Sequence, residues 1–225
     1  MAKHAILFLA ANPSGSTRLA LDREARDIHV ELERSGYRDQ FEFVTRWAVE
    51  PLDLLRELRK LRPMVVHFSG HGQKGPAAGP SEGAARRDLE SEDGPAAEQS
   101  GSGGLYFQAA GGGARLVSPA AIEHTFGAAG SSVRVVVLNA CYTAAQADAL
   151  LAHVDCVVGM SGAIGDDAAR HFAVGFYGGL GEREAVAKAY EQGKAAIALH
   201  GLRDGELPQL RVRAGVDAAR LVLAR

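Results

Sequence analysis

Short apolar runs bounded by turn-forming residues recur along this chain of 225 residues, and they restrict its fold more than any other feature. Such runs are typical of strands that are buried on both faces of a sheet. Between them lie stretches whose apolar residues recur at helical spacing. Strands that alternate with helices predict the α/β class, with a mostly parallel sheet covered by helices on both faces. The expected strands are 5–10, 41–46, 64–68, 133–138 and 154–160.

Helix-start residues support the same alternation. Pro51 stands where the first turn of a helix tolerates proline, and Ser118 before Pro119 is a favourable helix start. The other expected elements are a hairpin of 105–108 with 115–117, an edge strand at 209–213, and helices at 21–32, 51–61, 144–153, 166–180 and 183–199.

The segment from Gln73 to Gly104 differs in composition from the rest of the chain. Twenty of its 32 residues are Gly, Ala, Ser or Pro, and Leu89 is its only large aliphatic residue. Such a segment buries too little apolar surface to offset an ordering entropy of about 1–2 kcal/mol per residue. We interpret 73–104 as a flexible insertion in a single domain, 1–225, because only three expected strands precede it. Its Arg86-Arg87 pair suggests a lid or a self-processing site; a tolerated surface insertion is an equally good interpretation.

Composition excludes several classes of protein. The net charge is −2, which argues against a nucleic-acid or membrane-surface binder that works by bulk charge. Two cysteines are too few for a disulfide framework, and no apolar run reaches the 18 residues that a membrane span needs. The first residues resemble a strand more than a signal peptide. We therefore expect a cytoplasmic protein with two free thiols.

His71 and Cys141 each follow the end of an expected strand. In open parallel sheets, ligands bind beyond the carboxyl ends of the strands, where both side chains would emerge. An imidazole beside a thiol promotes the thiolate, which is the nucleophile. Gly70 and Gly72 flank the imidazole and allow the backbone to approach a substrate closely. The amides of Gly72 and Cys141 are the expected donors to a developing oxyanion.

Two motifs carry a family resemblance. HFSGHG at 67–72, followed by LNACYT at 138–143, resembles the CHAT branch of caspase-like cysteine peptidases, and 8–28 and 157–180 are also similar to that family. The resemblance implies a three-layer α/β/α caspase-like sandwich and a His–Cys dyad, with His71 and Cys141 at the matching positions. It also implies peptide hydrolysis through an acyl-enzyme. Members often occur in bacterial defence, including antiviral defence, or in cell-death modules, so an upstream sensor or activator protein is an expected partner. We expect a short, stand-alone form.

Other residues and motifs of the chain fit simpler roles or fail the requirements of other chemistries. Cys156 lies inside an apolar strand and is expected in the core, while His67 is expected to be a structural residue of its strand rather than a metal ligand. A cysteine phosphatase needs an arginine where Ala147 stands, and a serine-hydrolase elbow needs a glycine where Ala163 stands. We expect no metal and no cofactor.

Specificity rests on loops near the expected strand ends. Arg18, Asp22 and Glu24 follow the first strand, and Asp166 and Asp167 follow a later one. An acidic pocket selects Arg or Lys, whereas an arginine in the pocket selects Asp. The acidic candidates outnumber the basic one, which favours a basic residue before the cleaved bond. Asp22 and Asp166 also fit the simpler role of charges at helix starts.

The sequence thus predicts a cysteine endopeptidase that acts on a protein substrate, with Cys141 as nucleophile and His71 as general base. Asn139 is expected to help shape the loop before the cysteine. Two alternatives stay open: a catalytically silent interaction module with the same fold, and a small-molecule hydrolase with the same dyad. Neither nucleic acid nor a membrane is an expected direct partner.

Overall fold

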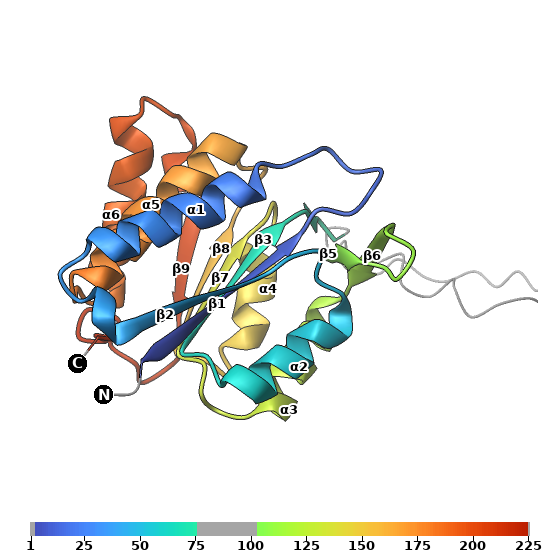
Figure 1. Ribbon diagram of the computed structural model, residues 1–225, viewed down its shortest axis with the longest axis horizontal. Helices are drawn as coiled ribbons and strands as arrows, with labels where there is room; N and C mark the ends of the chain where they lie inside the picture. The colour runs from blue at the N-terminus through green and yellow to red at the C-terminus, as the bar shows by residue number, and fades with distance from the viewer. Residues whose placement is uncertain (1–2, 76–102, 225) are drawn as a thin grey trace, which may run out of the picture.

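A computed structural model describes residues 3–75 and 103–224 and contains a central six-stranded sheet (Figure 1). Five neighbouring strands run parallel, and the last strand pairs antiparallel at one edge. The mostly parallel sheet predicted from the apolar runs is therefore confirmed. Across the sheet the strands are β2 (Phe41–Arg46), β1 (His4–Ala11), β3 (Val65–Gly70), β7 (Val135–Asn139), β8 (Cys156–Met160) and β9 (Pro208–Val212).

Helices cover both faces of the sheet, which gives the three-layer α/β/α arrangement (Figure 1). Alternate residues of β1 enter different cores: Ile6 and Phe8 pack under one layer, and Leu7 and Leu9 under the other. One layer contains α1 (Leu21–Arg34), α5 (Asp166–Gly181) and α6 (Val186–Leu199), and the other contains α2 (Pro51–Leu61), α3 (Pro119–Ala129) and α4 (Ala144–Leu150).

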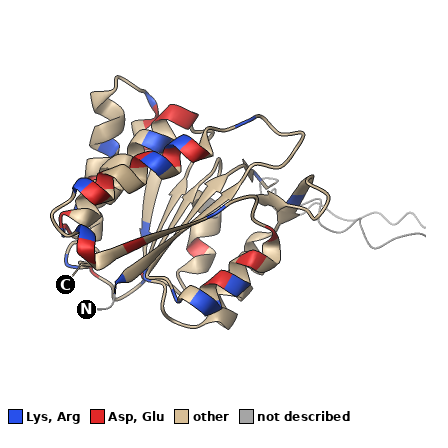
Figure 2. Ribbon diagram, viewed as in Figure 1, with Lys and Arg blue, Asp and Glu red and all other residues tan. Residues whose placement is uncertain are grey.

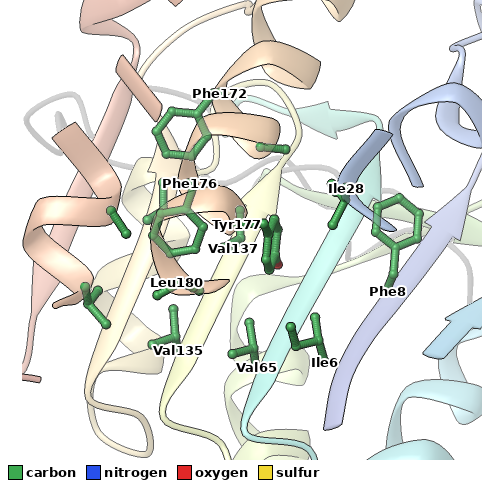
Figure 3. Close-up of a cluster of buried hydrophobic side chains, with 14 of the residues drawn as sticks. Ile6, Phe8, Ile28, Val65, Val135, Val137, Phe172, Phe176, Tyr177 and Leu180 are labelled. Atoms are coloured by element: carbon green, nitrogen blue, oxygen red, sulfur yellow. The ribbon is translucent and has the colours of Figure 1, made fainter. Parts of the chain in front are cut away.

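The core under α1 and α5 is rich in aromatic rings (Figure 3). Phe172 and Phe176 stack with their ring centroids 5.9 Å apart, and Tyr177 lies among apolar side chains with no exposed surface. Burying one such side chain contributes about 1.5–3 kcal/mol. Charges of both signs are interspersed along the outer sides of α1 and α2 (Figure 2), as the small net charge leads one to expect.

A second, three-stranded antiparallel sheet stands beside the carboxyl ends of β1 and β3. It consists of β4 (Gly72–Gln73), β5 (Gly104–Gln108) and β6 (Ala114–Val117). The β5–β6 hairpin confirms the prediction, but β4 was not predicted. Both ends of the supposed insertion are therefore ordered, because Gln73 pairs with Gly104. Arg86, Arg87 and Leu89 lie outside the described residues.

Local sequence sets the helix starts. Pro51 opens α2 behind a capping box formed by Glu50 and Asp53, and the Ser118 hydroxyl accepts the Ala121 N–H at 3.3 Å to cap α3. Several elements are shorter than predicted: α4 ends at Leu150, β8 begins at Cys156, and α6 begins at Val186. Among the described helices, none is both long and apolar enough to cross a membrane.

Candidate active site

Strands β3 and β7 bring His71 and Cys141 to the same edge of the sheet. Ser69 and Asn139 are paired in the parallel register, and each stands two residues before one of the candidate reactive residues. Side chains two apart on a strand share a face, so both reactive side chains follow the same face of their strands. They line one pocket, of about 40 Å³, together with residues of α1 and of the α5 start.

Gly72 lies directly against the backbone of Cys141. A Cβ atom placed on Gly72 would stand 2.1 Å from the Cys141 carbonyl oxygen and 3.3 Å from the Cys141 amide nitrogen. No side chain fits at that distance, so only glycine allows the segment that carries His71 to lie this close to Cys141. The close approach of these two segments is what the sequence motifs predict.

The His71 ring is oriented by the loop between β1 and α1. Its Nε2 atom lies 2.8 Å from the carbonyl oxygen of Thr17. A carbonyl oxygen only accepts hydrogen bonds, so Nε2 carries the proton and Nδ1 of the neutral ring is left as the base. The same contact stabilises the ring when it becomes an imidazolium. Thr17 was missed by sequence reasoning, because a backbone carbonyl leaves no signature in the residue type.

In the described part of the chain, the backbone N–H groups of Cys141 and Gly72 have no assigned acceptor. Within 3–75 and 103–224, the Cys141 N–H has no hydrogen-bond acceptor. The Tyr106 N–H donates to the His71 carbonyl at 3.0 Å, which makes Gly72 and Leu105 a non-hydrogen-bonded pair of the β4–β5 ladder. The ladder therefore does not use the Gly72 N–H. Neither expected oxyanion donor therefore has an assigned acceptor among the described residues.

The turn after Cys141 is strained and tightly held. Tyr142 has φ 59°, in the left-handed region that non-glycine residues rarely adopt, and its N–H donates to the Gly162 carbonyl at 3.1 Å. The buried Thr143 hydroxyl lies 2.9 Å from the carbonyl oxygen of Leu138 and accepts the Met160 N–H at 2.9 Å. Such strain costs about 1–3 kcal/mol and persists where neighbours fix the backbone. The turn presents Cys141 in one orientation.

Comparison with known proteins identifies the family. A family model described as the CHAT domain matches residues 2–204. The chain belongs to the CHAT domain family. A curated protein described as a Roc-COR-CHAT protease, from an unknown prokaryotic organism, is 25% identical over 199 residues. The match covers 85% of this chain but only 16% of that protein.

Two solved structures share the fold of this CHAT domain. A secreted C11 cysteine protease from Bacteroides thetaiotaomicron, solved with an irreversible peptide inhibitor, has a TM-score of 0.57 at 12% identity, covering 88% of this chain and 60% of that chain. The Drosophila initiator caspase Dronc has a TM-score of 0.53 at 9% identity, covering 93% of this chain and 79% of that chain. At these identities the likeness shows a caspase-like fold.

The structure separates the predicted specificity residues of the CHAT domain. Asp166 lines the pocket of His71 and Cys141, and its Oδ2 accepts the Ala20 N–H at 3.2 Å. Arg18 and Asp22 instead line a neighbouring cavity of about 420 Å³, which also contains the half-exposed ring of Trp47.

Asp167 is not brought to that pocket. Its carboxylate is exposed and pairs with Arg170 at 2.9 Å. The hydrogen bond from that guanidinium, followed by its charge, lowers the pKa of Asp167. Of the five residues predicted to set specificity, Glu24 and Asp166 line the pocket that contains His71 and Cys141.

Cys156 and His67 are both buried. Burial, followed by the charge of Asp155, raises the pKa of the Cys156 thiol from 9.0 to about 12, so this thiol is inert at neutral pH. His67 has no exposed surface, and its Nδ1 lies 3.1 Å from the Tyr177 hydroxyl. The part of the chain that the structure describes contains no cluster of three or more His, Cys, Asp or Glu residues able to hold a metal ion.

A buried carboxylate lies beneath the dyad, and its role was missed by sequence reasoning. Glu24 is only 3% exposed, and its carboxylate accepts hydrogen bonds from the Ser69 hydroxyl and the Asn139 amide. The sequence does carry a signal for it. Glu24 falls on the apolar face of α1, three positions after Leu21 and four before Ile28, where a charge needs buried partners.

Proposed function

We propose that this CHAT domain is a cysteine endopeptidase that cleaves a protein substrate through Cys141 and His71. The observation that carries the proposal is the close approach of Gly72 to Cys141 at the edge of the pocket that both reactive side chains line. The pocket lining shared by the imidazole and the thiol, and the lack of an assigned acceptor for the Gly72 and Cys141 N–H groups among the described residues, support the proposal. Thiol-mediated acyl transfer requires this set of groups.

The chemistry follows from the hydrogen bond between His71 Nε2 and the Thr17 carbonyl, which leaves Nδ1 as the acceptor nitrogen. Nδ1 takes the thiol proton of Cys141, and the thiolate attacks the scissile carbonyl carbon. The N–H groups of Gly72 and Cys141 donate to the resulting oxyanion. The imidazolium, held by the Thr17 carbonyl, then gives its proton to the departing amine, which leaves a thioester on Cys141. His71 next takes a proton from a water molecule as the water oxygen attacks the thioester carbonyl carbon. The carbon–sulfur bond breaks, the acid product leaves, and the Cys141 sulfur takes the proton back from His71.

We further propose a preference for Arg or Lys before the cleaved bond, with Asp166 as the recognition residue. Of the acidic candidates, Glu24 and Asp166 line the pocket of the dyad. The Glu24 carboxylate is buried and accepts hydrogen bonds from Ser69 and Asn139, whereas Asp166 is exposed. Its Oδ2 is fixed by the Ala20 N–H, which orients the carboxylate. Asp22 and Arg18, in the neighbouring cavity, belong to a more distant part of the substrate-binding surface.

The preference is tested with Asp166→Asn, with Asp167→Asn as the matched control from the next position. We expect kcat/KM for substrates with Arg or Lys before the cleaved bond to fall about 10- to 100-fold in the first variant, because a charged hydrogen-bonding partner is lost. We expect a change below about 3-fold in the control. An equal loss for basic and neutral substrates would contradict a recognition role for Asp166.

The activity itself is tested with a peptidyl chloromethylketone and a peptide library. We expect the reagent to label Cys141 in the wild type, and library cleavage to disappear in Cys141→Ala and persist in Cys156→Ala. Absence of both labelling and cleavage would favour the silent interaction module. Labelling with no cleavage of any peptide would favour a small-molecule hydrolase.

We propose that the substrate belongs to a bacterial defence or regulated cell-death pathway and that a sensor protein activates the domain. The resemblance of the motifs at 67–72 and 138–143 to CHAT peptidases supports this placement. Phage challenge of bacteria that express the wild type or Cys141→Ala tests it. Equal plaque counts for the two, with both proteins present and the sensor co-expressed, would contradict the defence role.

A further inference from the structure

The most unusual buried group outside the reaction itself is the Glu24 carboxylate. It is 3% exposed and projects from the first turns of α1 toward the ends of β3 and β7. A buried carboxylate is costly unless hydrogen bonds compensate it. A leucine or alanine at this position of the helix face would give an ordinary apolar contact. Packing alone therefore does not explain why a carboxylate stands at position 24.

Glu24 binds both strands that carry the dyad. Oε2 accepts the Ser69 hydroxyl from β3, and Oε1 accepts the Asn139 amide from β7 at 2.5 Å. Ser69 and Asn139 are register partners, and each lies two positions before a reactive residue. One carboxylate therefore joins the two strand ends immediately before His71 and Cys141.

The remaining contacts extend this cluster into the core. His67 Nε2 lies 3.0 Å from Glu24 Oε1 and has no assigned hydrogen-bond partner among the described residues. The other ring nitrogen of His67 contacts the Tyr177 hydroxyl of α5. Burial, with the Glu24 charge as a second cause, raises the pKa of Tyr177 well above its usual value and keeps this hydroxyl protonated. The Asn139 amide also donates to the Ala169 carbonyl of α5 at 3.2 Å.

The position of Glu24 on α1 matters as much as its partners. The loop that enters α1 carries Thr17, whose carbonyl oxygen orients the His71 ring. Asp166 fixes the same helix start through the Ala20 N–H. Glu24 therefore connects two parts of the site. One is the loop whose Thr17 carbonyl orients His71, and the other is the pair of strand ends that precede His71 and Cys141.

We propose that Glu24 is a positioning residue: its carboxylate sets the relative placement of His71, Cys141 and the Thr17 carbonyl. The proposal rests on the reactive pair assigned under the proposed function. Glu24 acts through Ser69 and Asn139 and takes no part in proton transfer. Without the carboxylate, the two strand ends and the loop lose their common anchor, and the thiol and imidazole spend less time in the reactive geometry.

The main variant is Glu24→Gln, which keeps the shape of the side chain but removes its charge and replaces one of its two acceptor oxygens by a donor. Glu33→Gln is the matched control, because it makes the same change at an exposed position of the same helix. Ser69→Ala is a milder variant that removes one donor and leaves the carboxylate in place. Unfolding in urea is recorded for each variant to separate folding from reactivity.

The readout is the rate at which iodoacetamide alkylates Cys141, measured by mass spectrometry from pH 5 to pH 9, together with kcat and KM on a cleaved peptide. For Glu24→Gln we expect alkylation at pH 7 and kcat to fall about 10- to 100-fold, because misplacement of about 1 Å has effects of that size. We expect KM to stay within about 3-fold of the wild-type value and the pH profile of Cys141 alkylation to change. Ser69→Ala is expected to show a loss of about 3- to 10-fold in the same direction, and Glu33→Gln none.

The outcomes separate this proposal from the proposed function. A folded Glu24→Gln that reacts within 2-fold of the wild type, with the same pH profile, would overturn the positioning role. If Glu24→Gln does not fold, wild-type reactivity in Ser69→Ala overturns it. If the wild type cleaves no peptide but Cys141 alkylation still depends on Glu24 and Ser69, the positioning role stands and the peptidase proposal fails.

Discussion

Gly72 offers the sharpest test of the site, because one added methyl group separates the two segments that carry the reactive residues. In Gly72→Ala the new Cβ would stand 2.1 Å from the Cys141 carbonyl oxygen. The contact is backbone rather than the end of a flexible side chain, so no rotamer change relieves it. The segment after β3 or the turn at Cys141 has to move.

The required movement sets the magnitude. Ordinary contact begins near 3.4 Å, so one of the two backbones shifts by about 1.3 Å. A misplacement of about 1 Å costs roughly 100-fold in rate, or about 2.7 kcal/mol of transition-state stabilisation. Overpacking also lowers the free energy of unfolding by about 1–3 kcal/mol. We therefore expect a folded protein with kcat/KM reduced about 100-fold.

The assay compares Gly72→Ala with Gly111→Ala, which makes the same change where a Cβ meets nothing within 4 Å. Both are measured for peptide cleavage, for alkylation of Cys141 and for unfolding in urea. Activity of Gly72→Ala within about 3-fold of the wild type, in a folded protein, would show that the close approach is not needed. The reasoning from strand-end geometry to catalysis would then be wrong.

Three further predictions concern groups outside the dyad. With iodoacetamide at pH 8, native protein should take up one alkyl group, at Cys141, and denatured protein two. The reason is that a pKa of about 12 leaves roughly one Cys156 side chain in ten thousand as thiolate. Rapid labelling of Cys156 in the native protein, detected by mass spectrometry, would contradict this. Asp155→Asn should lower the free energy of unfolding in urea by about 2 kcal/mol, because the buried carboxylate contacts two arginines, whereas Asp148→Asn at an exposed pair should change it by less than about 0.5 kcal/mol. Burial, followed by the charge of a second histidine, lowers the pKa of His171 below 6.5 in the folded protein. The unfolded chain therefore binds more protons, and this contribution to stability is present above pH 6.5 and lost as the pH falls through the folded-state pKa. Between pH 7.5 and pH 5.5 the free energy of unfolding should fall less in His171→Gln than in the wild type, and an equal fall would contradict the assignment.

Apolar patterning was enough to predict the layers of this fold. The runs at 5–10, 64–68 and 133–138 became the central strands because a strand buried on both faces needs an unbroken apolar segment. The small second sheet was harder to predict than the central one. Strand β4 has only two residues, and the chain beside it approaches closely at Gly103, where a Cβ would stand 2.3 Å from the Gln73 carbonyl oxygen. Glycine composition alone predicted flexibility there.

The reactive pair was predictable because its side chains are chemically distinctive and stand at strand ends. The groups that orient it were not. Thr17 acts through a carbonyl oxygen, which every residue type has, and only the path of the loop makes it a partner of His71. Asp22 and Arg18 were grouped with Asp166 by sequence position, but the start of α1 turns them toward a different cavity.

The register of β3 against β7 links the dyad to the buried cluster. Side chains alternate along a strand, so the column that ends at His71 continues inward through Ser69 to His67, and Cys141 is likewise preceded by Asn139. A shift of one residue in the pairing would send every side chain of β3 to the opposite face. Phe68 and Gly70 would then face Glu24, and the carboxylate would be buried without a donor from this strand. The cost of that unpaired charge disfavours the shifted register, so the same contacts that position the reactive pair also help to specify how the two strands pair.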